Sequence, residues 1–94
     1  MIMLARSIKV DPHRNTIEVA EGDFEIYREA DRYMVGRVPD GQLLGYFHVE
    51  LTDKGRVLAR GQVTGQLGLG SLEEARELLD VIGNAAIEHG IASA

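Results

Sequence analysis

The stretch Gly70–Gly90, GSLEEARELLDVIGNAAIEHG, decides the fold of this 94-residue chain. Ser71 is a good N-cap residue because its hydroxyl can accept a hydrogen bond from an amide of the first helical turn. Glu74, three residues later, can complete a capping box, and Gly90 can take the left-handed conformation that ends a helix. The stretch therefore predicts a helix from Ser71 to Gly90.

The predicted helix has an apolar side and an acidic side. At 100° per residue, the apolar side spans an arc of about 140°. It consists of Leu72, Ala75, Leu78, Leu79, Ile82, Ala85, Ala86 and His89. The opposite side carries Glu73, Glu77, Asp80, Asn84 and Glu88. Because the apolar side must be buried, we expect the preceding residues to form a sheet that covers it.

The residues before the helix alternate between apolar and polar side chains, which indicates β-strands. Residues that favour turns separate the alternating segments. The first predicted strands are residues 3–10, 16–20, 24–28 and 32–38. We predict an α+β fold, in which an antiparallel meander of five to six strands carries one C-terminal helix on one face. Residues 1–94 form a single domain.

Two turns fix the register of the later strands. They are residues 38–41, VPDG, and residues 52–55, TDKG. Each predicts a type I turn with a glycine bulge, because glycine accepts a positive φ without steric cost. With three-residue loops, Val35 lies opposite Gly45, and Phe47 lies opposite Gly61, which leaves room for its ring. Both registers place the same side chains on one face, namely Tyr33, Val35, Leu43, Phe47, Val49, Leu51, Val57, Ala59 and Val63.

The opposite face of the predicted sheet is mixed, although a solvent-facing sheet surface is usually more polar. Its apolar side chains are Met34, Val38, Leu44, Tyr46 and Leu58, and its polar ones are His48, Glu50, Arg60 and Gln62. The N-terminal hairpin could cover the apolar end, but its pattern fits two further strands of the same sheet better. We therefore expect a homodimer that buries this patch on both copies.

Composition restricts the classes of function. A net charge of −5 argues against direct binding of nucleic acid through phosphate neutralisation. The absence of cysteine excludes disulfides, thiolate metal sites and a thiol nucleophile. No segment is long and apolar enough to span a membrane, so we expect a cytoplasmic protein without membrane association.

The residues that could carry chemistry form few patterns. The glycine-rich segment 65–70 matches neither a P-loop nor a dinucleotide fingerprint, and no pair of histidines has the helical spacing of a zinc site. We expect neither a cofactor nor a metal. His48, Glu50 and Arg60 form a compact polar cluster on the mixed face. Its two alternatives are a general acid–base role and cross-strand ion pairing.

The acidic side of the helix is the other candidate site. Glu73, Glu77, Asp80 and Glu88 either are simply solvated or face arginines of a partner protein. With Tyr46, His48, Glu50 and Arg60, they make up the predicted binding residues. We expect a small acidic non-enzymatic interaction module, an inhibitor or adaptor that binds a basic surface of a protein partner. No resemblance to a known family reaches specific residues.

The alternative is a small-ligand-binding or enzymatic domain with a pocket between sheet and helix. The pocket would lie near Tyr33, Phe47 and Tyr46. Glycines at positions 45, 61, 65 and 68 would open it.

Overall fold

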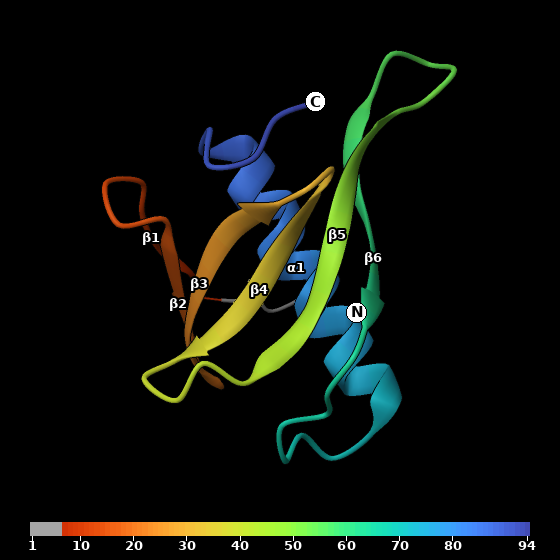
Figure 1. The fold of residues 1–94 in the computed structure, drawn as a ribbon. Helices are drawn as coiled ribbons and strands as arrows, with labels where there is room; N and C mark the ends of the chain where they lie inside the picture. Colours follow the sequence, from red (N-terminus) through yellow and green to blue (C-terminus); the bar gives the residue numbers. More distant parts are fainter. Residues whose placement is uncertain (1–6) are drawn as a thin grey trace.

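The fold is a six-stranded antiparallel meander followed by one helix, as the computed structural model of residues 7–94 shows (Figure 1). The strands lie side by side in the order of the sequence. They are β1 Lys9–Asp11, β2 Thr16–Val19, β3 Gly22–Glu29, β4 Arg32–Val38, β5 Leu43–Leu51 and β6 Val57–Val63, and the helix is α1 Leu72–Glu88. The predicted fold class is therefore confirmed.

The N-terminal hairpin extends the main sheet, because β1 pairs with β2 and β2 pairs with β3. The strand predicted over residues 3–10 is shorter, since β1 begins at Lys9. Residues 3–6 of that prediction lie outside the described residues. The hairpin does not fold over the outer face of β4 and β5.

Helix α1 begins and ends where its capping residues predict. The Glu74 N–H donates to Ser71 Oγ at 3.1 Å, and Gly90 has a φ of +78°. The predicted apolar arc is buried in its middle but not at its ends, where Leu72 is 52% exposed and His89 is also exposed. The prediction was wrong for these two residues because they lie at the two ends of the helix, outside its contact with the sheet.

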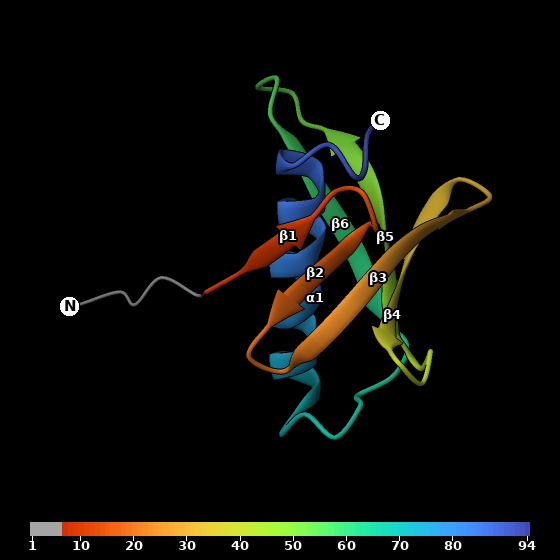
Figure 2. The same ribbon diagram turned by 90° about the vertical axis from the view of Figure 1, so that its left-hand side faces the viewer.

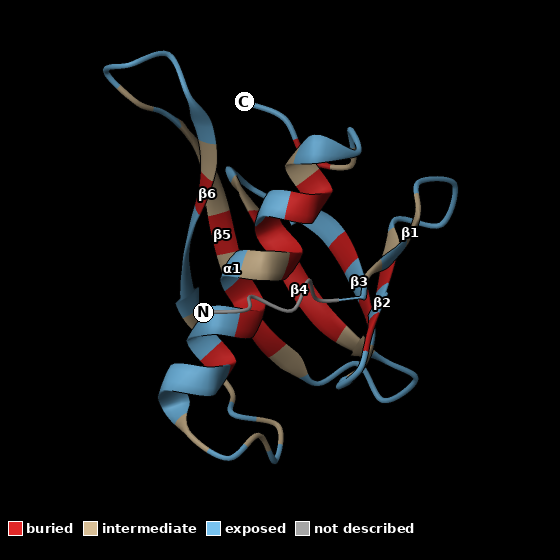
Figure 3. Ribbon diagram, turned by 180° about the vertical axis from the view of Figure 1, so that it is seen from behind, coloured by how far each residue is buried: buried red, intermediate tan, exposed pale blue. Residues whose placement is uncertain are grey.

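The sheet curls around α1, so that its concave face and the apolar side of the helix form one core (Figures 2 and 3). The helix packs most extensively against β6 and then against β5. The largest fully buried side chains are Phe24, Phe47, Ile17, Ile26, Leu44, Leu78, Leu79, Ile82 and Val35.

Small residues let the helix approach the sheet closely. A β-carbon at Gly61 would lie 3.0 Å from Leu79 Cδ2, and the same distance separates Leu79 Cδ2 from a β-carbon at Gly45. One turn further on, a β-carbon at Gly83 would lie 2.7 Å from Ala59 Cβ. Leu79 therefore fills the space that Gly45 and Gly61 leave, so these glycines serve helix packing and open no pocket.

The hairpin between β5 and β6 has the predicted register. Phe47 lies opposite Gly61, and Leu51 opposite Val57. The Gly55 N–H donates to the Thr52 carbonyl at 2.9 Å, and Gly55 has a φ of +77°, as a glycine bulge requires.

This hairpin extends past the end of the helix in Figure 1. Leu51 is 69% exposed and Val57 is 48% exposed, although both were predicted on the covered face. The face was predicted correctly, but the helix does not reach its end.

The hairpin between β4 and β5 departs from the prediction. The Gly41 N–H donates to the Arg37 carbonyl at 2.6 Å rather than to Val38, and the Val38–Pro39 peptide bond is cis. Val35 still lies opposite Gly45, but its neighbour Gly36 pairs with Leu43, so Leu44 is the extra residue of a β-bulge.

The bulge exchanges the two leucines. Leu44, predicted on the outer face, is fully buried in the core, whereas Leu43 lies 3.7 Å from the β-carbon position of Gly36 on the outer face. Met34, also predicted in the outer patch, is only 5% exposed. The apolar patch on which the dimer prediction depends therefore contains Leu43 in place of Leu44, and Met34 contributes little exposed surface to it.

The C-terminal residues close one end of the core. The Ser93 N–H donates to Tyr33 Oη, and the Tyr33 hydroxyl donates to the Ser93 carbonyl, both at 3.1 Å. The bond from Ser93 lowers the pKa of Tyr33 below its ordinary value because it stabilises the phenolate. Tyr33 also stacks on Phe47, with ring centroids 5.4 Å apart.

Candidate functional site

The outward face of α1 carries the predicted acidic residues. Glu73, Glu77, Asp80 and Glu88 are all exposed. Within residues 7–94, none of these carboxylates lies within ion-pair distance of a cation. Among the described residues, these four carboxylates on one helix thus have no ion-pair partner, and they lie in the arrangement that the periodicity predicts.

Asn84 lies in the same face but has a different role. Its Oδ1 accepts a hydrogen bond from the Ala59 N–H at 3.0 Å, and its Nδ2 donates to the Asp80 carbonyl at 2.9 Å. Because β6 is an edge strand, this side chain caps a backbone donor that β5 cannot reach. The sequence pattern missed this contact, since it groups Asn84 with the solvated side of the helix.

The outer face of the sheet brings Tyr46, His48, Glu50 and Arg60 together, as the register predicts. Arg60 Nε donates to Glu50 Oε2 at 2.6 Å, and His48 lies opposite Arg60. Of the two alternatives for this cluster, the geometry matches cross-strand ion pairing. The carboxylate of Glu50 is bound to the guanidinium of Arg60, which is always charged, as expected for a structural ion pair.

Two further residues extend this outer cluster. The guanidinium of Arg32 lies 4.5 Å from the centroid of the Tyr46 ring, and the Tyr46 hydroxyl donates to Gln62 Oε1 at 2.9 Å. The cation–π contact with Arg32 and the hydrogen bond to Gln62 together hold the ring of Tyr46 in place on the surface. The predicted register could have indicated Gln62, because it places this residue opposite Tyr46. No local sequence pattern indicates Arg32, which lies on the neighbouring strand β4.

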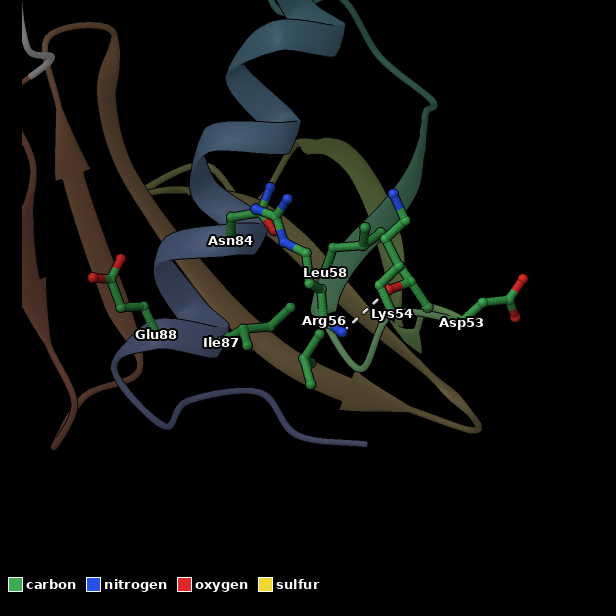
Figure 4. A pocket seen from close by; sticks show the side chains of 9 residues that line it. Asp53, Lys54, Arg56, Leu58, Asn84, Ile87 and Glu88 are labelled. Atoms are coloured by element: carbon green, nitrogen blue, oxygen red, sulfur yellow. Dashed lines mark hydrogen bonds between the residues drawn. The ribbon is translucent and has the colours of Figure 1, made fainter.

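A hollow of about 860 Å³ lies between the β5–β6 turn and the C-terminal half of α1. It is lined by Thr52, Asp53, Lys54, Arg56, Val57, Leu58, Asn84, Ile87 and Glu88. Figure 4 shows the side chain of Arg56 extending toward Asn84, whereas the carboxylates of Asp53 and Glu88 point away from the middle. Neither Lys54 nor Arg56 forms an ion pair with another described residue.

This hollow is not the predicted pocket. Tyr33 and Phe47 stack on each other inside the core, and Tyr46 lies on the other face of the sheet. The structure does not bring the three rings around one cavity. The observed hollow arises instead because the hairpin extends beyond the helix and leaves the side of Val57 open.

The described part of the chain contains no group of three or more histidine, cysteine, aspartate or glutamate residues placed to hold a metal ion. None of the helices formed within residues 7–94 is long and apolar enough to cross a membrane.

Comparison of the chain with protein-family models, with curated proteins and with solved structures finds no significant match. A functional conclusion therefore depends on the side chains described above, because a fold alone does not assign a function.

Proposed function

We propose that this chain is a small acidic, non-enzymatic interaction module of the cytoplasm that binds a basic surface of a protein partner. It would act as an inhibitor that occupies this surface, or as an adaptor. The observation that carries the proposal is the outward face of α1, where Glu73, Glu77, Asp80 and Glu88 are exposed and free of ion pairs within residues 7–94.

The helix presents these carboxylates with a defined spacing. On a helix, the β-carbons of residues four positions apart are generally about 5–6 Å apart, and Glu73 and Glu77 have this spacing in the sequence. A carboxylate can accept two hydrogen bonds from one guanidinium, so arginine-rich surfaces are the chemistry that such a row recognises. Free carboxylates also steer a basic partner toward the helix and raise the rate of association at low salt.

The rigidity of α1 supports the same function. Leu79 lies against Gly45 and Gly61, and Gly83 lies against Ala59, which holds the helix on the sheet. A partner therefore meets a row of charges that is already ordered, which lowers the entropic cost of binding.

A pulldown from native lysate tests the proposal. The test variant neutralises the helix through Glu73→Gln, Glu77→Gln and Glu88→Gln, and it keeps Asp80. The control makes equal charge changes on exposed residues of β2 and β3, through Glu18→Gln, Glu25→Gln and Glu29→Gln.

We expect wild type and control to retain a stoichiometric basic protein at low salt, and the test variant to lose it. Retention by wild type should also fall as salt rises, because exposed charges are screened. If the test variant retained the partner as well as the control did, the helix would not be the binding surface.

A second candidate function is the binding of a small amphipathic anion in the hollow of Figure 4. Its support is the pair of cations Lys54 and Arg56, which have no ion-pair partner among residues 7–94 and lie beside the apolar Val57 and Ile87. Native mass spectrometry of the purified protein tests this function. A co-purifying organic anion that Arg56→Gln releases would support it, and a protein without any bound molecule would contradict it.

A further inference from the structure

The hollow of Figure 4 contains an outward-facing backbone donor of the edge strand β6. The Ala59 N–H donates to Asn84 Oδ1 at 3.0 Å, so the backbone groups of Ala59 point away from β5. In an antiparallel pair this direction alternates along the strand, so Val57, two residues earlier, also directs its N–H away from β5. Val57 lines the hollow, and so does Asn84.

These two backbone donors differ in what they meet. The side-chain carbonyl of Asn84 accepts from Ala59, whereas no residue within 7–94 provides the Val57 N–H with an acceptor. An oxygen that lay beside Asn84 could reach the Val57 N–H in the same way. The neighbouring contact thus shows which chemistry this position takes, namely a hydrogen-bond acceptor that approaches from the side of the helix.

Two cations indicate that this acceptor carries a negative charge. Lys54 and Arg56 line the same hollow, and neither forms an ion pair with another described residue. The side chain of Arg56 extends toward Asn84 in Figure 4. A guanidinium forms strong, charge-assisted hydrogen bonds with a carboxylate. A carboxylate beside Val57 therefore finds a donor for each of its two oxygens.

The acidic residues of the lining restrict the charge of the ligand. Asp53 and Glu88 point away from the middle of the hollow in Figure 4, so they leave its centre open to an anion. They still repel a second negative charge there. A phosphate monoester carries nearly two charges at neutral pH, whereas a carboxylate carries one. The lining consequently favours an anion with a single charge.

The surface next to this position is apolar. Val57 is 48% exposed, and Leu51, directly opposite it in the register, is 69% exposed, although both lie on the inward face of the sheet. Ile87 borders the hollow on the side of the helix. A hydrocarbon chain that covered these side chains would remove apolar surface from water on both sides.

We propose that the hollow binds a small amphipathic monocarboxylate, a molecule with one carboxylate and an apolar chain. One carboxylate oxygen accepts from the Val57 N–H and the other from Arg56, while the chain covers Leu51, Val57 and Ile87. The volume of about 860 Å³ is in the usual range for small-molecule sites. This inference rests on the second candidate function, the binding of an organic anion, and it names the class of that anion.

Titration of the ¹⁵N-labelled protein with octanoate, followed in amide NMR spectra, tests the proposal. Two probes separate the parts of the ligand, since 1-octanol has the chain without the charge and acetate has the charge without the chain. We expect octanoate to shift the Val57 amide signal and to bind roughly tenfold more tightly than either probe. Octyl phosphate should bind more weakly than octanoate because of its second charge.

Substitutions assign the binding to the named groups. Arg56→Gln should weaken octanoate binding roughly tenfold, because it removes the charge-assisted hydrogen bonds. Val57→Ser keeps the backbone donor but loses apolar contact, and it should weaken binding about threefold. Arg14→Gln, which removes a cation in the β1–β2 turn at the other edge of the sheet, is the control and should change nothing. All three side chains are exposed, so circular dichroism should show an unchanged fold.

The proposal is overturned if millimolar octanoate leaves the Val57 amide signal in place. It is also overturned if 1-octanol binds as tightly as octanoate, or if Arg56→Gln binds octanoate as wild type does. Tighter binding of octyl phosphate than of octanoate would contradict the carboxylate as the recognised group.

The outcome is independent of the proposed basic partner. Glu88→Gln belongs to the pulldown variant that should lose this partner, but here it removes a nearby negative charge and should tighten octanoate binding slightly. A protein that binds its partner through α1 and does not bind octanoate would end only the monocarboxylate proposal. A co-purifying organic anion without a carboxylate would likewise end this inference and leave the second candidate function standing.

Discussion

The two hairpins that share β5 have turns of the same sequence type, yet only one keeps a regular register. In the β5–β6 hairpin, the register continues without a break from Gly45 opposite Val63 to Leu51 opposite Val57. In the β4–β5 hairpin, the register shifts between Val35 and Gly36. The difference shows that turn residues favour a loop, while burial near the loop decides how the strands pair beside it.

The cause of the shift is a choice between two adjacent leucines. In a regular strand, Leu43 and Leu44 point to opposite faces, and only one of them can reach the core. The bulge buries Leu44 completely and lets Leu43 lie over Gly36 on the outer face. The apolar surface that both leucines remove from water compensates for the interrupted ladder.

The largest effect that we predict is a difference in stability between substitutions at Leu44 and at Leu43. Leu44→Ala should destabilise the protein by about 2–5 kcal/mol, because it leaves a cavity in the core. Leu43→Ala should cost less than about 1.5 kcal/mol, since this side chain is only half-buried. Urea unfolding of both variants measures the difference. A larger loss at Leu43 would place the bulge elsewhere and restore the regular register.

A smaller effect tests the turn of the β5–β6 hairpin. Gly55 has a φ of +77°, and a β-branched residue there should cost about 1–3 kcal/mol. We therefore expect Gly55→Val to lower the midpoint of thermal unfolding clearly. Gly55→Asn should lower it much less, because asparagine tolerates the left-handed region. Equal shifts for valine and asparagine would contradict a role for the positive φ.

The hairpins also show what the sequence can and cannot predict. Caps and periodicity are local, so α1 and its acidic row with Glu77 and Asp80 could be predicted. The register of β6 could be predicted as well, because TDKG is sufficient to set it, and this placed His48 opposite Arg60. The bulge at Leu44 could not be predicted, because it depends on how much surface the helix covers.

Some parts of the candidate site depend on how far the helix covers the sheet, and the sequence did not predict them for the same reason. Periodicity places Val57 on the inward face, but nothing local indicates that the helix ends before reaching it. The hollow beside Arg56 and the bond from Ala59 to Asn84 both follow from the position of the helix relative to the edge strand. Such relations join segments distant in sequence.

The smallest predicted effect concerns the charge in each turn. In the β4–β5 turn, hydrogen bonds from the Arg37 side chain, together with the Gln42 N–H, hold the pKa of Asp40 below its ordinary value. A lowered pKa in the folded state means that the ionised form is the stabilising one. Its contribution is present above the ordinary pKa of aspartate and is lost as the pH falls through the folded-state pKa.

Wild type should lose stability when the pH falls from about 7 to about 2.5, and Asp40→Asn should lose less over the same range. The effect should be small and should shrink further in high salt, since the ion pair is at the surface. The control is Asp53→Asn in the β5–β6 turn, because Asp53 forms no ion pair within the described chain. The difference between the urea midpoints at the two pH values should become smaller only in Asp40→Asn. If Asp53→Asn reduced the pH dependence equally, net charge rather than the Arg37 contact would explain it, and the two turns would be electrostatically equivalent.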